Sequence, residues 1–128
     1  MRLEFTTRTD LAIRAINILK DAEQRISRKA LAQRLDTTPH FLARVMAPLV
    51  HNGWVNSGTG PGGGYEIDGS ADSLSVYDLV AAVEGVPEEG KCVLRRGGCL
   101  PDQTCALHDA WSRARSALMS ELRSSNVF

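Results

Sequence analysis

The feature that most constrains the fold is a short polar break, Asp36–Pro39, between two short helical segments. Ser27 suits the N-cap of the first segment, and Thr38 suits the N-cap of the second, because a hydroxyl can accept a hydrogen bond from the first turn. Pro39 fits that first turn, where its missing N–H costs nothing. Two short helices joined by such a turn predict a helix-turn-helix. The expected core positions of the second helix are Phe41, Leu42, Val45, Leu49 and Val50.

A glycine-rich turn follows, between two strand candidates. The strand candidates are Trp54–Ser57 and Tyr65–Ile67, and Gly58–Gly64 can connect them tightly. A helix-turn-helix followed by a hairpin is a winged helix. The glycines could instead cradle a phosphate, but no Lys-Ser/Thr pair and no long helix follow them directly. We therefore expect a wing.

Three further helices are expected around this unit. The first spans Thr9–Ala22 and starts with a capping pair, Thr7 and Asp10. The others span Ser75–Glu84 and Ala106–Ser124. The last helix carries an apolar stripe with nearly heptad spacing, which favours a partner helix, although packing on its own domain is the alternative. The stripe consists of Leu107, Trp111, Ala114, Leu118 and Leu122.

Charge is balanced overall but unevenly distributed. The chain has 128 residues, which fits one domain, with 15 Lys and Arg against 15 Asp and Glu. Residues 24–60 hold five basic residues against Asp36 alone, and residues 66–89 hold acidic residues with no Lys or Arg. The basic segment suggests a face for a polyanion, and a solvated mixed surface is the alternative. No apolar run suits a membrane span and the opening residues lack a secretory signal, so we expect a cytoplasmic protein.

Three cysteines and one histidine form the strongest chemical motif, Cys92-x6-Cys99-x5-Cys105-x2-His108. Structural zinc sites prefer closer cysteine pairs, so this spacing favours an iron–sulfur cluster over zinc. Arg95 and Arg96 lie between the cysteines, where their charge would offset thiolates. Three unrelated thiols are the alternative.

Three thiolates leave a cluster one ligand short. His108 could complete the set, or it could be an ordinary polar residue of a first helical turn. Asp10 could do so only from a second subunit, and its alternative role is helix capping. The residues alone leave both candidates open.

Two other classes of protein deserve comparison. A zinc-binding RNA module can use a similar set of ligands, but the cysteine loop lacks aromatic residues that would stack on bases. A small redox enzyme would leave the helix-turn-helix unexplained, and nothing beyond the cysteines provides a substrate pocket. We therefore expect no enzyme.

The run from Leu49 to Tyr65, with its Gly60-Pro61-Gly62-Gly63-Gly64-Tyr65 turn, resembles the Rrf2 family of bacterial winged-helix transcription regulators. The resemblance covers residues 1–122, and Arg2-Leu3 and Thr9–Ala12 fit the family's first helix. The three loop cysteines make the chain most similar to the iron–sulfur members of the NsrR and IscR types.

This resemblance implies a homodimer crossed through the last helix and binding to a palindromic operator in double-stranded DNA. Cys92, Cys99 and Cys105 match the cluster cysteines. Asp10 matches the partner ligand of a [4Fe-4S] cluster in NsrR-like members, and His108 matches the ligand of a [2Fe-2S] cluster in IscR-like members. We expect [4Fe-4S] slightly over [2Fe-2S], in a repressor that senses nitric oxide, redox state or iron supply.

The expected fold class is mainly α with a small β-hairpin wing: a winged helix-turn-helix plus a long C-terminal dimerisation helix. Its expected parts are a DNA-binding domain at 1–69, a short helix and cluster loop at 70–105, and the dimerisation helix at 106–128. The expected DNA contacts are Arg28, Lys29, Thr37, Thr38, His40, Arg44, Gly62 and Gly63.

Overall fold

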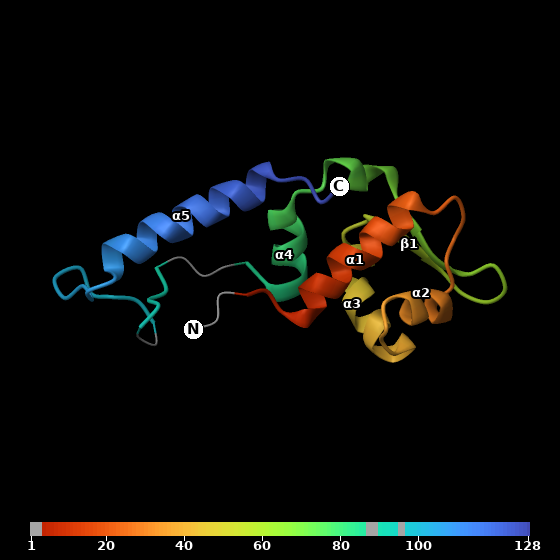
Figure 1. Cartoon of the computed structure of the whole chain (residues 1–128), viewed down its shortest axis with the longest axis horizontal. Coiled ribbons are helices and arrows are strands. Elements are labelled where there is room, and N and C mark those ends of the chain that lie inside the picture. Colours follow the sequence, from red (N-terminus) through yellow and green to blue (C-terminus); the bar gives the residue numbers. More distant parts are fainter. Residues whose placement is uncertain (1–3, 87–89, 95–96) are drawn as a thin grey trace.

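A computed structural model describes residues 4–86, 90–94 and 97–128. Within these ranges the chain is mainly helical with one antiparallel hairpin, so the predicted fold class is confirmed. A globule is built from the N-terminal elements, and the last helix extends from it as an arm (Figure 1). The elements are α1 (Thr7–Asp21), α2 (Arg28–Arg34), α3 (Pro39–His51), β1 (Val55–Gly58), β2 (Gly64–Ile67), the 3-10 turn η1 (Gly69–Ser73), α4 (Val76–Glu84) and α5 (His108–Ser124).

The predicted helix-turn-helix is confirmed in its caps and its turn. The Ser27 side chain accepts a hydrogen bond from the N–H of Ala30, and that of Thr38 accepts one from the N–H of Phe41. Asp36 in the turn has φ of +53°, which a short polar side chain tolerates better than most. The buried face of α3 is close to the predicted one and consists of Leu42, Val45, Met46 and Leu49.

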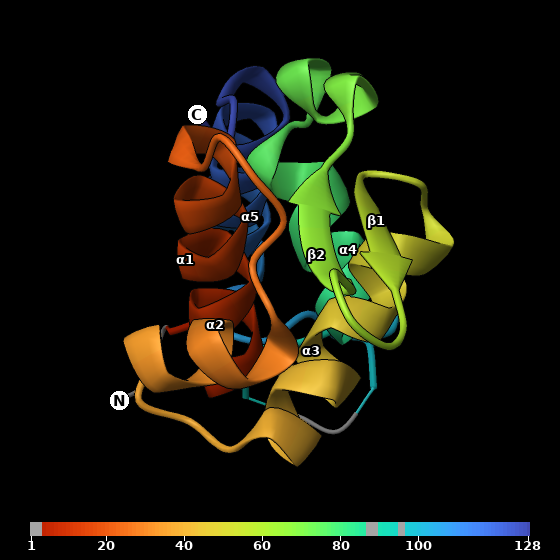
Figure 2. The ribbon, with the colours of Figure 1, turned by 90° about the vertical axis from the view of Figure 1, so that its right-hand side faces the viewer.

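The hairpin is held by a third chain segment that the sequence did not reveal. Ile26 and Tyr65 exchange two backbone hydrogen bonds of 2.9 and 2.8 Å, so the segment before α2 pairs with β2. Gly64 is required here, because it has φ of +115° and a Cβ would strike the carbonyl of Ile26. This pairing fixes the wing beside α2 and α3, which face the viewer together with it in Figure 2.

The predicted start of the first helix is wrong in detail. α1 begins at Thr7 rather than Thr9, and Thr6 is the N-cap, whose hydroxyl accepts from the N–H of Thr9 at 3.5 Å. Asp10 therefore does not act in a capping pair with Thr7, and its carboxylate instead faces Arg14 at 3.5 Å. The helix packs on α3 and α4 through an apolar face made of Leu11, Ala12, Ala15, Ile16 and Leu19.

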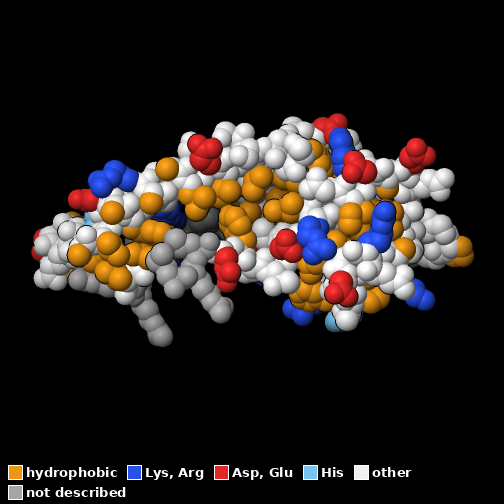
Figure 3. Space-filling view, in the orientation of Figure 1, with side chains coloured by type: hydrophobic (Ala, Val, Ile, Leu, Met, Phe, Trp, Pro, Cys, Tyr) orange, Lys and Arg blue, Asp and Glu red, His pale blue; other side chains and the backbone are white. Residues whose placement is uncertain are grey.

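Fewer side chains of α5 are buried than its predicted apolar stripe suggests. In α5, whose residues are all described, only Leu122 is buried, whereas Leu118 is 48% exposed. The half-buried face of α5 is rotated from the predicted stripe and consists of His108, Trp111, Arg115 and Met119. Figure 3 shows hydrophobic side chains gathered over α5 and α4 on one face of the molecule.

The segment after α5 returns to the globule. The N–H of Val76 donates to the carbonyl of Ser125 at 2.8 Å, and the N–H of Val127 donates to the carbonyl of Leu74 at 3.0 Å. Val127 is also buried in the core. The C-terminal end of α5 is therefore fixed to the start of α4. Among the described residues, no helix is both long and apolar enough to cross a membrane.

Candidate functional site

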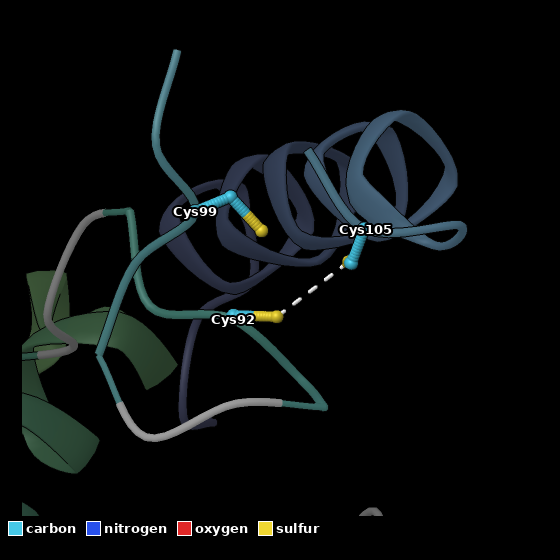
Figure 4. Close-up of side chains that lie close together, drawn as sticks. All are labelled: Cys92, Cys99 and Cys105. Atoms are coloured by element: carbon cyan, nitrogen blue, oxygen red, sulfur yellow. Dashed lines mark hydrogen bonds between the residues drawn. The ribbon is translucent and has the colours of Figure 1, made fainter. Parts of the chain in front are cut away.

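The three cysteines lie together at the far end of the arm. Their sulfur atoms are all within 4.8 Å of one another, and the side chains point toward a common centre (Figure 4). The Sγ atoms of Cys92 and Cys105 are 3.6 Å apart. All three thiols are half-buried and none is in a disulfide. This is a set of soft ligands, which suits a thiophilic metal or an iron–sulfur cluster.

Hydrogen bonds hold two of the three cysteines, Cys92 and Cys105, near the first turns of α5. The indole N–H of Trp111 donates to the carbonyl of Lys91 at 3.2 Å, which fixes the residue beside Cys92. The N–H of His108 donates to the carbonyl of Cys105 at 3.1 Å. Cys92 is also held within its loop, since its own N–H donates to the carbonyl of Gly97 at 2.9 Å. The start of α5 is therefore the frame of the site.

The surroundings of Cys105 favour the neutral thiol when no metal is bound. A hydrogen bond from the N–H of Leu107 lowers its pKa, but partial removal from water and the adjacent thiols of Cys92 and Cys99 outweigh this effect. The net result is a raised pKa. Ligation of a metal by Cys105 must therefore release a proton at neutral pH.

A small cavity of about 60 Å³ lies at the cysteines. Its lining shows which of the predicted ligands lie near the three thiols. His108 lines it with all three cysteines, but its ring nitrogens are not part of the close group of ligand atoms. Asp10 is on α1, where it is exposed and faces Arg14. Within the described residues, Asp10 neither lines this cavity nor joins the group.

Arg115 also lines the cavity and was not predicted. The predicted basic residues, Arg95 and Arg96, lie outside the described residues. Arg115 follows His108 by two helical turns, so the spacing along α5 could have indicated it. Its side chain therefore borders the same cavity as the three thiols.

One hydrogen-bonded group connects the end of α4 to the start of the first helix. Glu84 ends α4, just before the loop, and its Oε1 accepts from the N–H and hydroxyl of Thr6, both at 2.7 Å. The same oxygen accepts from the hydroxyl of the fully buried Thr9 at 2.6 Å. Partial removal from water raises the pKa of Glu84, but these hydrogen bonds and the charge of Arg8 outweigh it and lower the pKa.

A second site is a groove of about 870 Å³ between α2, α3 and the wing. Four of the predicted DNA contacts line it, namely Arg28, Lys29, Gly62 and Gly63. His51 lines it too and was missed, although it continues the four-residue spacing of Pro39, Ala43 and Ala47 on α3. The groove thus joins basic side chains, an exposed helix face and a hairpin turn, which are the parts that a duplex contacts.

The other four predicted contacts lie outside the lining of this groove. His40 and Arg44 are exposed on α3, away from its buried face. The hydroxyl of Thr38 caps α3, which leaves its oxygen less available to a ligand. Thr37 is half-buried and lines a separate recess beside Phe41.

Comparisons with known proteins agree with this architecture. Residues 5–127 match the family model Rrf2, described as an iron-dependent transcriptional regulator. The HTH-type transcriptional regulator IscR of Escherichia coli is 31% identical over 81 residues, which are 63% of this chain and 49% of IscR. The chain thus spans about half the length of the curated relatives that it matches.

Solved structures show the same fold over nearly the whole chain. CymR of B. subtilis, a global cysteine regulator, is 27% identical with a TM-score of 0.75, over 98% of this chain and 94% of CymR. IscR of T. potens, at 19% identity, has a TM-score of 0.68 over 98% of this chain and 83% of that one. These relatives are named as regulators rather than enzymes. The chain therefore belongs to the Rrf2 family of transcriptional regulators.

Proposed function

We propose that the chain is a DNA-binding transcription repressor whose affinity for its operator depends on an iron–sulfur cluster. The observation that carries this proposal is the group of three thiols within 4.8 Å, in a chain that also has a winged helix-turn-helix. A regulator needs a structural connection through which its ligand site can affect its DNA site. Glu84 supplies such a connection, because it ties the loop end of α4 to the start of α1.

The cluster would be held by Cys92, Cys99 and Cys105. His108, which lines the same cavity, and Asp10 of a second subunit are the two candidates for the fourth ligand. We favour [4Fe-4S] over [2Fe-2S] because of the match of Asp10 to NsrR-like members. When bound, the cluster supplies iron that reacts with nitric oxide or oxygen, and Arg115 offsets the negative charge of the thiolates.

The DNA would be double-stranded and bound in the groove between α2, α3 and the wing. Arg28 and Lys29 are placed to meet phosphates, and Arg44 and His40 are exposed for contacts with base edges. A homodimer on a palindromic operator would present two such grooves one helical turn apart. Support for the dimer comes from the predicted stripe, which leaves two leucines exposed: Leu107, just before α5, at 44%, and Leu118, within α5, at 48%.

We assign one role to each of three parts of the chain. Residues 1–69 would bind DNA, residues 70–105 would hold the cluster, and residues 106–128 would dimerise. Cluster loss would release the loop between α4 and α5. The two copies of α3, the second helix of each helix-turn-helix, would thereby shift relative to each other. Such coupling between two sites is typically worth about 1–3 kcal/mol.

The decisive experiment is anaerobic purification, with counts of iron, sulfide and zinc and a Mössbauer spectrum. We expect iron and sulfide in equal amounts, bound through the three cysteines. An operator is then selected from random duplexes, and loaded and cluster-free protein are compared for binding to it. Zinc without sulfide would contradict the cluster, and equal operator affinity of the two forms would contradict the sensing mechanism.

A further inference from the structure

We infer that Cys92 and Cys105 form a reversible disulfide when the metal-free protein meets a hydroperoxide. Their sulfur atoms lie 3.6 Å apart, which is van der Waals contact and close enough for one thiol to bond the other. A disulfide requires the sulfurs to approach to about 2.05 Å, so they must move closer by about 1.5 Å. This is a redox modification of the protein itself, distinct from the chemistry of a bound cluster.

The backbone favours this pair among the three thiols. Cys105 precedes α5 and is fixed to its first turn through His108. Cys92 is held near the same turn, because the carbonyl of Lys91 accepts from the indole of Trp111. Both thiols are thus held close to one end of the same helix. Cys99 lies in the middle of the loop between them, where among the described contacts no equivalent bond to α5 holds it.

The chemistry balances with one equivalent of hydrogen peroxide. The thiolate of one cysteine attacks a peroxide oxygen, which gives a sulfenic acid and releases the other oxygen as water. The second thiolate then attacks the sulfenic sulfur, forms the S–S bond and expels hydroxide, which leaves as water after protonation. In total, two thiols and one peroxide give one disulfide and two molecules of water. A dithiol reductant reverses the modification by exchange.

The disulfide would control whether the three cysteines can bind a metal ion or a cluster. A disulfide removes two of the three thiolates, so neither a metal ion nor a cluster could be held until the bond is reduced. This consequence rests on the proposed function, but the formation of the bond does not. The site would then report peroxide in the cluster-free protein, independently of any reaction at iron.

The test treats the whole 128-residue chain, stripped of metal with a chelator, with one equivalent of hydrogen peroxide and maps it with trypsin. The sequence places Cys92 on the peptide Cys92–Arg95, whereas Cys99 and Cys105 share the peptide Gly97–Arg113. We expect a loss of about 2 Da, a decrease from three free thiols to one, and a link between these two peptides. Protein that keeps three free thiols, or that closes a bond within the second peptide, would overturn the inference.

Two serine variants identify the partner and serve as matched controls. Cys99→Ser should still form the link and keep no free thiol, whereas Cys105→Ser should lose the link. A link that persists undiminished in Cys105→Ser would show that Cys99 is the partner and would refute the proposed pair. Circular dichroism confirms that each variant is folded before oxidation.

A measurement of iron and sulfide uptake distinguishes this inference from the proposed function. Oxidised protein should take up no iron and sulfide until dithiothreitol is added, while reduced protein should take them up at once. Equal uptake before and after reduction would contradict the blocking of the site. If reduced protein takes up none but the link forms, the cluster proposal fails while the disulfide stands.

Discussion

Replacing Glu84 with glutamine should destabilise the protein although the side chain is exposed. One carboxylate oxygen accepts three hydrogen bonds, two from Thr6 and one from the buried hydroxyl of Thr9. Hydrogen bonds to a charged group contribute about 1.5–3 kcal/mol each when buried, but water screens an exposed carboxylate. We therefore expect Glu84→Gln to lower the free energy of unfolding by about 1–2 kcal/mol at pH 7.

The assay is urea unfolding followed by tryptophan fluorescence, with Glu23→Gln as the control. Glu23 is exposed in the bend after α1, so its variant should stay within about 0.5 kcal/mol of the parent. Thr9→Val removes one donor of nearly equal shape, and its effect should be smaller in the Glu84→Gln background. Strictly additive effects, or a Glu84→Gln variant as stable as Glu23→Gln, would refute the role of this network.

The same network predicts a dependence on pH. Because the folded protein holds the pKa of Glu84 below its ordinary value, the carboxylate contributes stability that is fully present above the unfolded pKa. That contribution is lost as the pH falls through the folded pKa. The difference in stability between the parent and Glu84→Gln should therefore shrink in acid, and a constant difference would contradict the assignment.

Three further predictions concern DNA binding, assembly and the fourth ligand. Arg44→Ala should weaken operator binding by about 1–3 kcal/mol and relax specificity at one base pair, and unchanged affinity in a binding titration would remove Arg44 from the interface. Leu118→Asp should dissociate the dimer in sedimentation experiments because it places a charge on the proposed seam, while the exposed Ser120→Asp should not, and a persistent dimer would move the interface elsewhere. Of His108→Ala and Asp10→Ala, the variant that removes the fourth ligand should make the cluster more labile, which is measured as a faster loss of its absorbance. If neither variant changes the cluster, both residues are excluded as the fourth ligand.

Local signals predicted local structure well in this chain. The caps Ser27 and Thr38 depend on hydrogen bonds to residues three positions away, so the sequence alone indicated both helix starts. The cysteine spacing likewise predicted one site, because the loop that holds it is continuous in sequence. Partners far apart in sequence were not predictable in this way. Thr6 became the cap of α1 beside Glu84, 78 residues away.

The face of α5 could not be predicted for a similar reason. Its apolar residues occur on more than one side of the helix, so spacing alone did not show which side meets α4. The structure places His108 and Arg115 in the lining of the cysteine cavity, which does not include Leu118. The site therefore includes a charge that a search for metal ligands does not consider.

The return of the chain after α5 fixes one end of this helix, so that the helix could tilt about that end. The backbone bonds of Ser125 and Val127 hold one end on the globule, while the cysteines lie at the other end. At about 1.5 Å per residue, the 17 residues of α5 span roughly 25 Å. A tilt of about 10° about the fixed end then moves the cysteine end by about 4 Å, by the helix length given above. A small angular change where α5 meets α4 would thus be magnified at the cysteines, and a displacement of the cysteine end would reach the globule as a smaller one.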